Sequence, residues 1–541
     1  MNKACIFARA NVVTITLGAV ATALALQAGA VSAAEAVTLP IVKQPLSLSY
    51  WVPMNPQAPA VIKSYAEMDA YKLLAERTGV SVSFTHPPQG AELERLNLMV
   101  ASGKYPDVIE YDWFRYPGGP GKALADKAIV PLNDLIKKYA PNLQAILDKY
   151  PEVRRQVSTE DGTIYVFPLL RLDPVVRTFW GPQIRADWLA KLGLKAPTTI
   201  GEWHTVLTAF KTRNPNGEGN VIPYSTNQVD GNEKSAPGLP YGLWPFMSAY
   251  GLAPEFYQVG GKVRYSPAEP AYKDFLATMQ QWYREGLIDP DYVSQRETAL
   301  DAKVLKNEVG AWAGYNGAQL GRFTNLAKGK IAGFQVAGVP FPAGANGKRY
   351  TTWPTASQIF SGYGAAISSQ DRHVVETVKF LDYGYSKEGG LALNFGREGV
   401  SYTMVNGVPR FTDSVLKNPK LSIAEAILRN ARPQGGPFVQ DPNYFLQFYP
   451  LKEQTEALHT WATASTDLLL PPITVNPADA RALNAKMAEI STYVAEMTTK
   501  FITGRAPMSE FDAYRATLDK LGMRDAIAMM QTALDRYNTK K

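Results

Sequence analysis

The residues best suited to contact a ligand in this sequence are aromatic. Ten Trp, 28 Tyr and 21 Phe make up 11% of 541 residues. Aromatic planes stack on the apolar faces of pyranose rings, while indole and phenol groups still form hydrogen bonds. Hydrophobic cores account for most of these rings. The remaining candidates for carbohydrate contact are Trp51, Trp113, Trp244, Trp312, Tyr315, Trp353 and Tyr444.

Arg397, in the segment FGREGVSY, is the candidate partner for an acidic group on such a ligand. A guanidinium presents two parallel donors to a carboxylate. A salt bridge with Glu398 or another acid is the alternative role for this side chain. The formal charge is +7, or about +5 after removal of Lys3 and Arg9 with a leader, without a long basic run. This charge modestly favours an acidic ligand, and no nucleic-acid motif is present.

Metal and thiol chemistry are poorly supported. The loop Asn214–Asn220 imitates the first half of a calcium loop. However, Asn214 replaces the first aspartate, and no acid follows Asn220, so an ordinary Asn/Gly turn is preferred and no cofactor is expected. The four histidines are far apart and indicate no zinc site. Cys5 is the sole cysteine, which excludes a disulfide scaffold.

The elements that position these residues begin with a strand–helix alternation. We expect a helix from Glu92 that ends at Gly103, followed by a buried strand over Asp107–Tyr111. Upstream, the pattern predicts a strand, a helix and a strand over Leu46–Trp51, Ser64–Gly79 and Val80–His86. This order builds a parallel sheet, and ligands bind beyond the carboxyl ends of its strands. Candidates at those ends are Trp51, Tyr111, Asp112 and Trp113.

Several blocks resemble one protein family. LMVASGKYPDVIEYDW (Leu98–Trp113) is similar to a stretch of the extracellular solute-binding proteins of ABC importers for sugars and oligosaccharides. Other blocks look like the larger members, among them periplasmic alginate-binding proteins: Asp161–Leu170, Ile184–Lys211, Gly261–Val293 and Leu393–Thr403. Gly435–Phe445, which contains Tyr444, matches a further segment of the alginate binders. The resemblance implies an α/β fold with two lobes, a hinge and an interlobe cleft.

The N-terminus predicts export. Residues 1–34 contain Lys3 and Arg9, an apolar run and small residues, as in a cleavable signal peptide. The run is too short and too interrupted for a membrane anchor, and no cysteine stands at the cleavage point to carry a lipid. We therefore expect a periplasmic protein that is not lipid-anchored. About five hundred mature residues exceed one core, so more than one domain is expected.

The resemblance also predicts how the chain is divided. The first lobe should comprise residues 46–171 with 360–418, and the second residues 172–359 with 419–541, the largely helical final third packing on the second lobe. Trp244, Trp312 and Tyr315 should line the second lobe's side of the cleft. Trp353 lies in the region expected to cross back to the first lobe.

These features predict the substrate-binding component of an ABC transporter. It should be monomeric, capture an oligosaccharide, with uronate-containing chains favoured, and deliver it intact to membrane permease subunits without catalysis. The alternative from another class is a secreted polysaccharide-degrading hydrolase or lyase. Such an enzyme needs facing carboxylates or a Tyr/His/Arg group, which 49 acids make available somewhere in the chain. A peptide-binding importer component is a further alternative.

Overall fold

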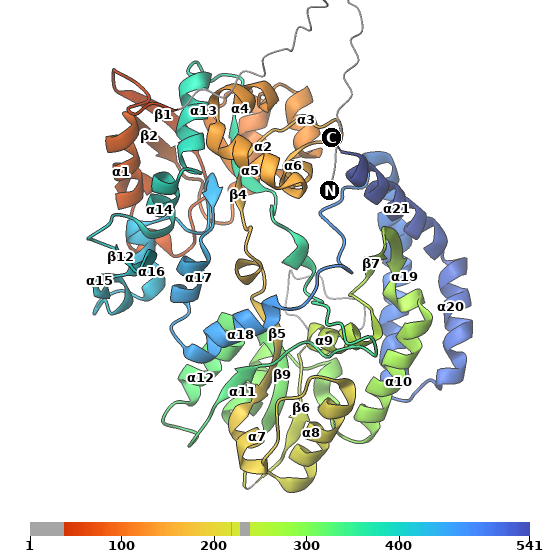
Figure 1. The fold of residues 1–541 in the computed structure, drawn as a ribbon. Coiled ribbons are helices and arrows are strands. Elements are labelled where there is room, and N and C mark those ends of the chain that lie inside the picture. The colour runs from red at the N-terminus through yellow and green to blue at the C-terminus, as the bar shows by residue number, and fades with distance from the viewer. Residues whose placement is uncertain (1–36, 218, 228–238, 541) are drawn as a thin grey trace, which may run out of the picture.

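The computed structural model describes residues 37–217, 219–227 and 239–540. The predicted signal peptide lies outside these residues. The chain forms two main sheets, one in each lobe, with helices packed around them (Figure 1). The larger sheet has the strand order β14-β4-β11-β3-β1-β2, and the smaller has the order β10-β5-β9-β6. Each sheet has its own large hydrophobic core.

The first lobe is built on the six-stranded sheet. Strands β1, β2 and β3 run parallel, as the strand–helix alternation predicted, whereas β11 runs antiparallel to β3 and β4. These strands are β1 (Leu46–Trp51), β2 (Val80–Thr85), β3 (Val108–Asp112), β4 (Phe167–Leu170) and β11 (Tyr363–Ile367). The helices are α1 (Asp69–Thr78), α2 (Glu92–Ser102), α3 (Gly119–Ala125), α4 (Asn133–Tyr139), α5 (Pro141–Lys149), α6 (Pro151–Val157), α13 (Val374–Tyr383) and α14 (Lys387–Phe395).

The second lobe is built on the four-stranded sheet. Strand β5 is antiparallel to β9 and β10, and β6 is parallel to β9. These strands are β5 (Trp180–Arg185), β6 (Ile222–Tyr224), β9 (Val309–Tyr315) and β10 (Val336–Gly338). A hairpin, β7 (Phe256–Val259) and β8 (Lys262–Tyr265), lies outside this sheet. The helices before the return to the first lobe are α7 (Ala186–Leu192), α8 (Ile200–Arg213), α9 (Trp244–Met247), α10 (Pro270–Arg284), α11 (Glu297–Leu305) and α12 (Arg322–Ala327).

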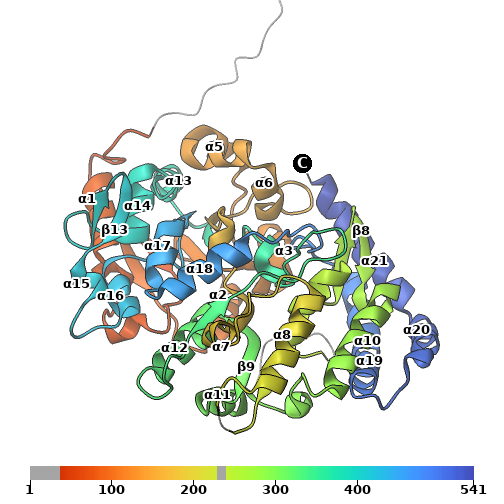
Figure 2. The ribbon, with the colours of Figure 1, turned by 60° about the horizontal axis from the view of Figure 1, so that its bottom comes forward.

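Four more helices belong to the second lobe at the end of the chain. Helix α18 (Lys452–Ala462) packs on β5 and β10, while α19 (Pro477–Ile502), α20 (Phe511–Lys520) and α21 (Met523–Thr539) lie along its outer side (Figures 1 and 2). Two glycines let α18 approach the sheet. A Cβ on Gly181 would lie 2.5 Å from the Trp461 ring, and one on Gly338 would lie 2.3 Å from the Ala457 Cβ. None of the helices described here is both long and apolar enough to cross a membrane.

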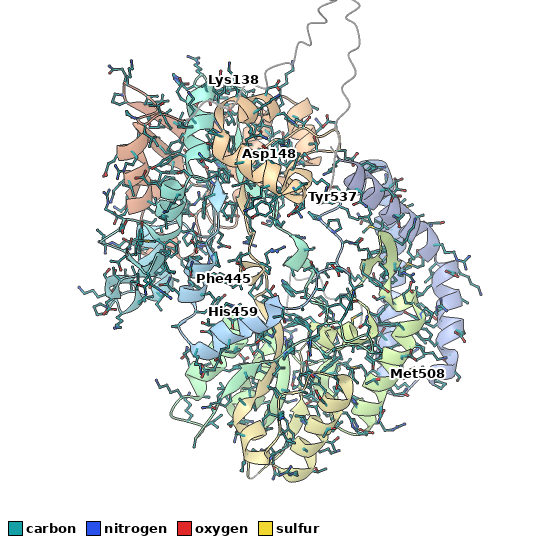
Figure 3. All side chains as sticks on the ribbon, viewed as in Figure 1. Lys138, Asp148, Phe445, His459, Met508 and Tyr537 are labelled. Atoms are coloured by element: carbon teal, nitrogen blue, oxygen red, sulfur yellow. The ribbon has the colours of Figure 1, made fainter. Side chains whose placement is uncertain are left out.

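The chain leaves the first lobe later than the predicted boundary at residue 419. Strand β14 (Phe438–Val439) pairs with β4 of the first lobe, and α17 (Pro442–Phe448) follows it. The chain therefore passes to the second lobe only near Leu451, between Phe445 of α17 and His459 of α18 (Figure 3). A third hydrophobic cluster contains residues of α17, of β12 (Tyr402–Val405), β13 (Val408–Phe411), α15 (Asp413–Leu416) and α16 (Ile423–Asn430), and Leu458 of α18.

Helix ends follow the local sequence signals. Gly79 and Gly103 take left-handed conformations with φ of 75° and 62° directly after α1 and α2, as predicted for Gly103. Thr199 accepts a hydrogen bond from the Glu202 amide and caps α8. On α2, Leu96 is buried, but Leu93 is 44% exposed, so the buried face of this helix is narrow.

Candidate ligand-binding site

Three segments of the chain join the two lobes. Arg171–Phe179 joins β4 to β5, residues 339–362 join β10 to β11, and residues 440–451 join β14 to α18. We call these the three crossovers. The first two run side by side, because the Arg171 amide donates to Ile359 O at 3.0 Å and Arg177 Nη1 donates to Ala356 O at 3.0 Å.

An aromatic cluster lies where the crossovers enter the second sheet. Phe179 ends the first crossover, Trp180 begins β5, Tyr315 ends β9, and Trp353 belongs to the second crossover. Trp180 stacks on Trp353 with ring centroids 5.4 Å apart, and Trp353 also contacts Tyr315 edge-on at 5.4 Å. We define the hinge aromatic cluster as these four residues together with two more that contact them, Tyr241 and Trp244.

The hinge aromatic cluster has an accessible edge and an enclosed interior. Phe179, Tyr315 and Trp353 are partly exposed, and they contact one another at centroid distances of 5.4–6.1 Å. Trp180 and Trp244 are buried behind them. The indole N–H groups of Trp180, Trp244 and Trp353 are enclosed without a hydrogen-bond partner among the described residues. The partly exposed rings of the cluster thus present a stacking surface of the kind that suits a sugar ring.

Hydrogen-bonded polar side chains link the segment after β1 to the third crossover. Asn55, beyond β1, donates from Nδ2 to Gln434 Oε1 at 3.2 Å, and Gln434 Nε2 donates to the Tyr444 hydroxyl at 3.2 Å. Burial raises the pKa of Tyr444, so its hydroxyl stays protonated at neutral pH. We call Asn55, Gln434 and Tyr444 the polar edge. It brings together residues more than three hundred positions apart in sequence.

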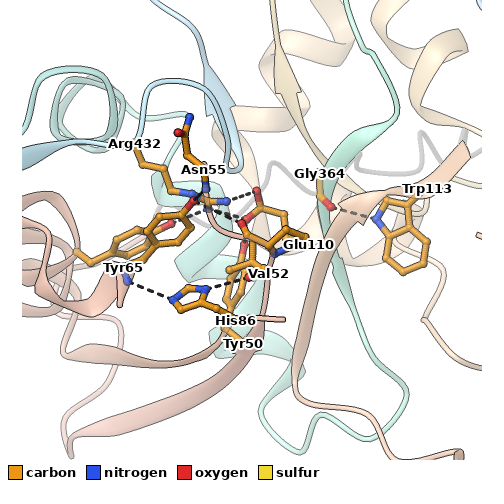
Figure 4. A network of polar contacts seen from close by, with 11 residues as sticks. Tyr50, Val52, Asn55, Tyr65, His86, Glu110, Trp113, Gly364 and Arg432 are labelled. Atoms are coloured by element: carbon orange, nitrogen blue, oxygen red, sulfur yellow. Dashed lines mark hydrogen bonds and ion pairs between the residues drawn. The ribbon is translucent and has the colours of Figure 1, made fainter. Parts of the chain in front are cut away.

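A buried ion pair holds the polar edge in place (Figure 4). Both guanidinium nitrogens Nη1 and Nη2 of Arg432 donate to the Glu110 carboxylate at 2.8 Å, and Arg432 is 3% and Glu110 0% exposed. Tyr50 donates to the same carboxylate at 2.6 Å, and the guanidinium lies 4.3 Å above the Tyr65 ring. Because Glu110 belongs to β3, the pair fixes the segment that carries Gln434 onto the first sheet.

Two predicted ligand contacts are instead core residues. Trp312 is 0% exposed and donates from its indole nitrogen to Gln183 Oε1 at 2.8 Å. Trp113 is 1% exposed, stacks on Tyr116 and donates to Gly364 O at 3.0 Å. With faces covered and donors used, neither is available to a ligand, and both assignments were wrong. Each residue lies in or just after a strand buried on both faces, where sequence alone does not show which way a side chain points.

The other predicted residues have different surroundings. Tyr315, Trp353 and Trp244 belong to the hinge aromatic cluster, and Tyr444 contributes its hydroxyl to the polar edge although its ring is buried. Trp51, 6% exposed, packs edge-on against Tyr111 and lines a surface pocket of about 400 Å³ whose other residues include His86, Arg95 and Lys104.

Arg397 lies on the surface of the first lobe. Its Nη2 is 2.7 Å from Glu76 Oε1, and its guanidinium is 34% exposed. The side chain therefore takes its alternative role, a salt bridge, although the acid is Glu76 of α1 and not the neighbouring Glu398. The structure therefore does not favour Arg397 as the partner of a ligand carboxylate.

The Asn214–Asn220 loop forms a turn. Asn214 has a φ of 42°, and Asn216 Nδ2 donates to Asn220 O and Asn307 O at 3.0 and 3.2 Å. Glu218 lies outside the described residues. In the part of the chain that is described, no group of three or more His, Cys, Asp or Glu side chains is placed to hold a metal ion.

Comparison with known proteins gives this geometry a context. Residues 57–391 match the model of the bacterial extracellular solute-binding protein family. The chain belongs to this family. It is 26% identical over 540 residues to the fructooligosaccharide ABC transporter substrate-binding protein FusA of Streptococcus pneumoniae, covering 94% of this chain and 93% of FusA. The predicted two-lobe α/β fold and family resemblance are therefore confirmed.

Solved structures agree with this assignment. The alginate-binding protein AlgQ2, in a structure without calcium ion, is 28% identical and superposes with a TM-score of 0.61, covering 91% of this chain and 99% of AlgQ2. A solute-binding protein from Bifidobacterium longum infantis described as binding HMO has a TM-score of 0.68 at 21% identity, covering 92% of this chain and all of that one. The latter likeness concerns the fold alone.

Proposed function

We propose that this solute-binding protein captures an oligosaccharide between its lobes and delivers it to the permease of an ABC importer. The observation that carries the proposal is the hinge aromatic cluster, whose three partly exposed rings lie where the crossovers enter the second sheet. The names of FusA and AlgQ2, which bind a fructooligosaccharide and alginate, support the saccharide class.

The two lobes contribute different chemistry to this task. The hinge aromatic cluster supplies planes for the apolar faces of sugar rings, and the polar edge supplies amide and hydroxyl groups for their hydroxyls. Closure of the lobes brings the two surfaces onto one ligand. Delivery requires reversible binding, for which a dissociation constant on the order of micromolar, or about 8 kcal/mol, is suitable.

The test is a titration of the purified protein with fructooligosaccharides, alginate oligomers and oligopeptides, followed by tryptophan fluorescence. A saccharide should change the fluorescence, and chromatography should recover it intact. Trp353→Ala should weaken binding by about tenfold or more, equivalent to about 1.4 kcal/mol. Tyr493→Ala is the matched control, because Tyr493 is a partly exposed aromatic on α19 that stacks on Tyr514 outside the cluster.

Three results would contradict the proposal or the site assigned to it. Response to peptides alone would favour the peptide-binding alternative. Sustained cleavage of a glycosidic bond, abolished by replacing a single carboxylate, would favour the enzyme alternative. Equal affinity of Trp353→Ala and the unmodified protein would remove the hinge aromatic cluster from the binding site.

We further infer that the protein is exported to the periplasm without a lipid anchor and binds its ligand without calcium. The signal-peptide pattern of residues 1–34 supports export, and the asparagine-rich turn at Asn214 supports calcium independence. The measurements are the mass of the mature protein from periplasmic extracts and the ligand affinity before and after treatment with a chelator. An acylated N-terminus, or a loss of affinity that added calcium restores, would contradict these inferences.

A further inference from the structure

Arg171 occupies a distinctive place at the junction of the lobes. It is the first residue after β4, and its amide hydrogen bond to Ile359 O ties it to the second crossover. Beside it, the Gln440 amide donates to Leu170 O, so the third crossover begins at the same edge. Arg171 therefore lies among all three crossovers, at the strand ends that also carry the polar edge.

The guanidinium of Arg171 is half-buried without an acidic partner. No described residue forms a hydrogen bond or ion pair with it, whereas the buried Arg185 and Arg432 are paired with Asp187 and Glu110. Burial lowers the pKa of Arg171. A guanidinium remains charged nonetheless. An uncompensated, partly desolvated charge at this position costs free energy that an anion would recover.

The groups around Arg171 suit a carboxylate. Tyr444, on the third crossover, is hydrogen-bonded to Gln434, which is hydrogen-bonded to Asn55. These neighbours are neutral and supply no competing negative charge at neutral pH. A planar carboxylate can accept two parallel hydrogen bonds from a guanidinium, and amide groups can bind the adjoining hydroxyls.

We propose that Arg171 binds the carboxylate of an acidic saccharide, so that the oligosaccharide contains uronate residues. This inference rests on the proposed function, because it assigns one charged group of the ligand to a position beside the polar edge. Arg171 thereby takes the role that the sequence suggested for Arg397.

Calorimetry with a tetramer of mannuronate and with the neutral tetrasaccharide nystose tests the assignment. The unmodified protein should bind the uronate tetramer more tightly than nystose, and its affinity should fall as salt is raised. Arg171→Gln should weaken uronate binding by about tenfold to a hundredfold and leave any nystose binding unchanged. Arg171→Lys should recover part of the loss, because it restores the charge without the two parallel donors.

Arg524→Gln is the charge-matched control. Arg524 is 82% exposed and pairs with Asp519 on the outer helices, so its loss should leave uronate affinity unchanged. Thermal unfolding of each variant checks that it is folded. If Arg171→Gln does not fold, the Arg171→Lys affinity decides: an undiminished affinity for uronate overturns the bidentate assignment.

The outcomes separate this inference from the proposed function. Binding of nystose but not of the uronate tetramer would overturn the Arg171 assignment and leave an oligosaccharide-binding protein. Equal uronate affinity in Arg171→Gln and the unmodified protein would do the same. Failure to bind any saccharide would overturn both.

Discussion

Replacement of Arg432 by methionine tests whether the buried ion pair stabilises the first lobe. Arg432 and Glu110 are 3% and 0% exposed, so Arg432→Met leaves a carboxylate buried with only the Tyr50 hydroxyl as a donor from this network. Breaking a buried pair on one side typically costs about 3–5 kcal/mol. The variant also loses the hydrogen bond to Tyr71 and the contact with the Tyr65 ring.

The double variant Arg432→Met with Glu110→Met removes both charges. It therefore separates the loss of the ion pair from the cost of leaving one charge buried without a partner. Replacing both partners of a buried pair by apolar groups of similar size is often neutral or stabilising. The double variant should therefore recover most of the stability lost in the single one. Arg397→Met, which breaks the exposed pair with Glu76, is the control and should cost about 0–1 kcal/mol.

Urea unfolding followed by tryptophan fluorescence and circular dichroism measures these differences. Two lobes with separate cores can unfold in separate transitions, so the transition that shifts should be the first lobe's. With a slope of about 1–3 kcal/mol per molar urea, the expected loss moves its midpoint by at least about 1 M. A shift equal to that of Arg397→Met, or a double variant as unstable as the single one, would refute the reasoning.

Three further predictions concern pH, packing and lobe contact. Burial raises the pKa of Asp382 to about 6, above its usual value near 4, so the folded protein holds a proton that the unfolded chain releases. The unfolding free energy should therefore fall as pH rises from about 4 to about 6, and Asp382→Asn should flatten this part of its pH profile. Gly338→Ala should destabilise the second lobe by about 1–3 kcal/mol in urea, because the new methyl meets Ala457. Arg536→Ala, which removes the contact with Glu160, should raise the radius of gyration of the free protein in X-ray scattering.

The first strands and helices could be predicted because their signals are local. The strand predicted over Leu46–Trp51 has the same bounds in the structure, and Gly103 ends α2 where expected. The lobe boundary could not be predicted in the same way. Strand β14 has two residues, too few for a periodic pattern, and it is joined to the first lobe through Arg432 and Glu110, which are 322 positions apart.

The candidate site was predictable in residue type but not in position. Trp312 and Trp180 both lie in buried strands of one sheet, yet Trp312 packs in its interior and Trp180 stacks on Trp353 at the hinge. The choice depends on register, since Trp180 stands opposite Tyr315 at the end of the β5–β9 ladder. Phe179 and Trp180 were missed although they lie shortly after the predicted lobe boundary at residue 172. Their signal was two adjacent rings where the first crossover meets β5.

The contacts between the lobes explain how a ligand could control their separation. Besides the crossovers, the C-terminal end of α21 lies beside the first lobe (Figure 1). Lys540 Nζ, directly after α21, donates to Ser158 O at 2.8 Å, and Arg536 Nε lies 3.2 Å from Glu160 Oε1. Pairs of this partly exposed kind contribute little, about 0–1 kcal/mol, whereas the buried Arg432 pair resists separation. Opening should therefore break the α21 contacts and leave the Arg432–Glu110 pair of the first lobe in place.

The placement of binding groups on both lobes determines how a ligand affects the equilibrium between the open and closed states. A ligand shifts an equilibrium between open and closed lobes only if it binds one state more tightly. A saccharide held by the hinge aromatic cluster alone would bind both states equally, because that cluster belongs to the second lobe. A saccharide that also reaches Arg171 and the polar edge joins the two lobes, and each contact across the hinge then adds to the free energy of closure. The carboxylate at Arg171 would thus contribute to the signal that the transporter reads as well as to affinity.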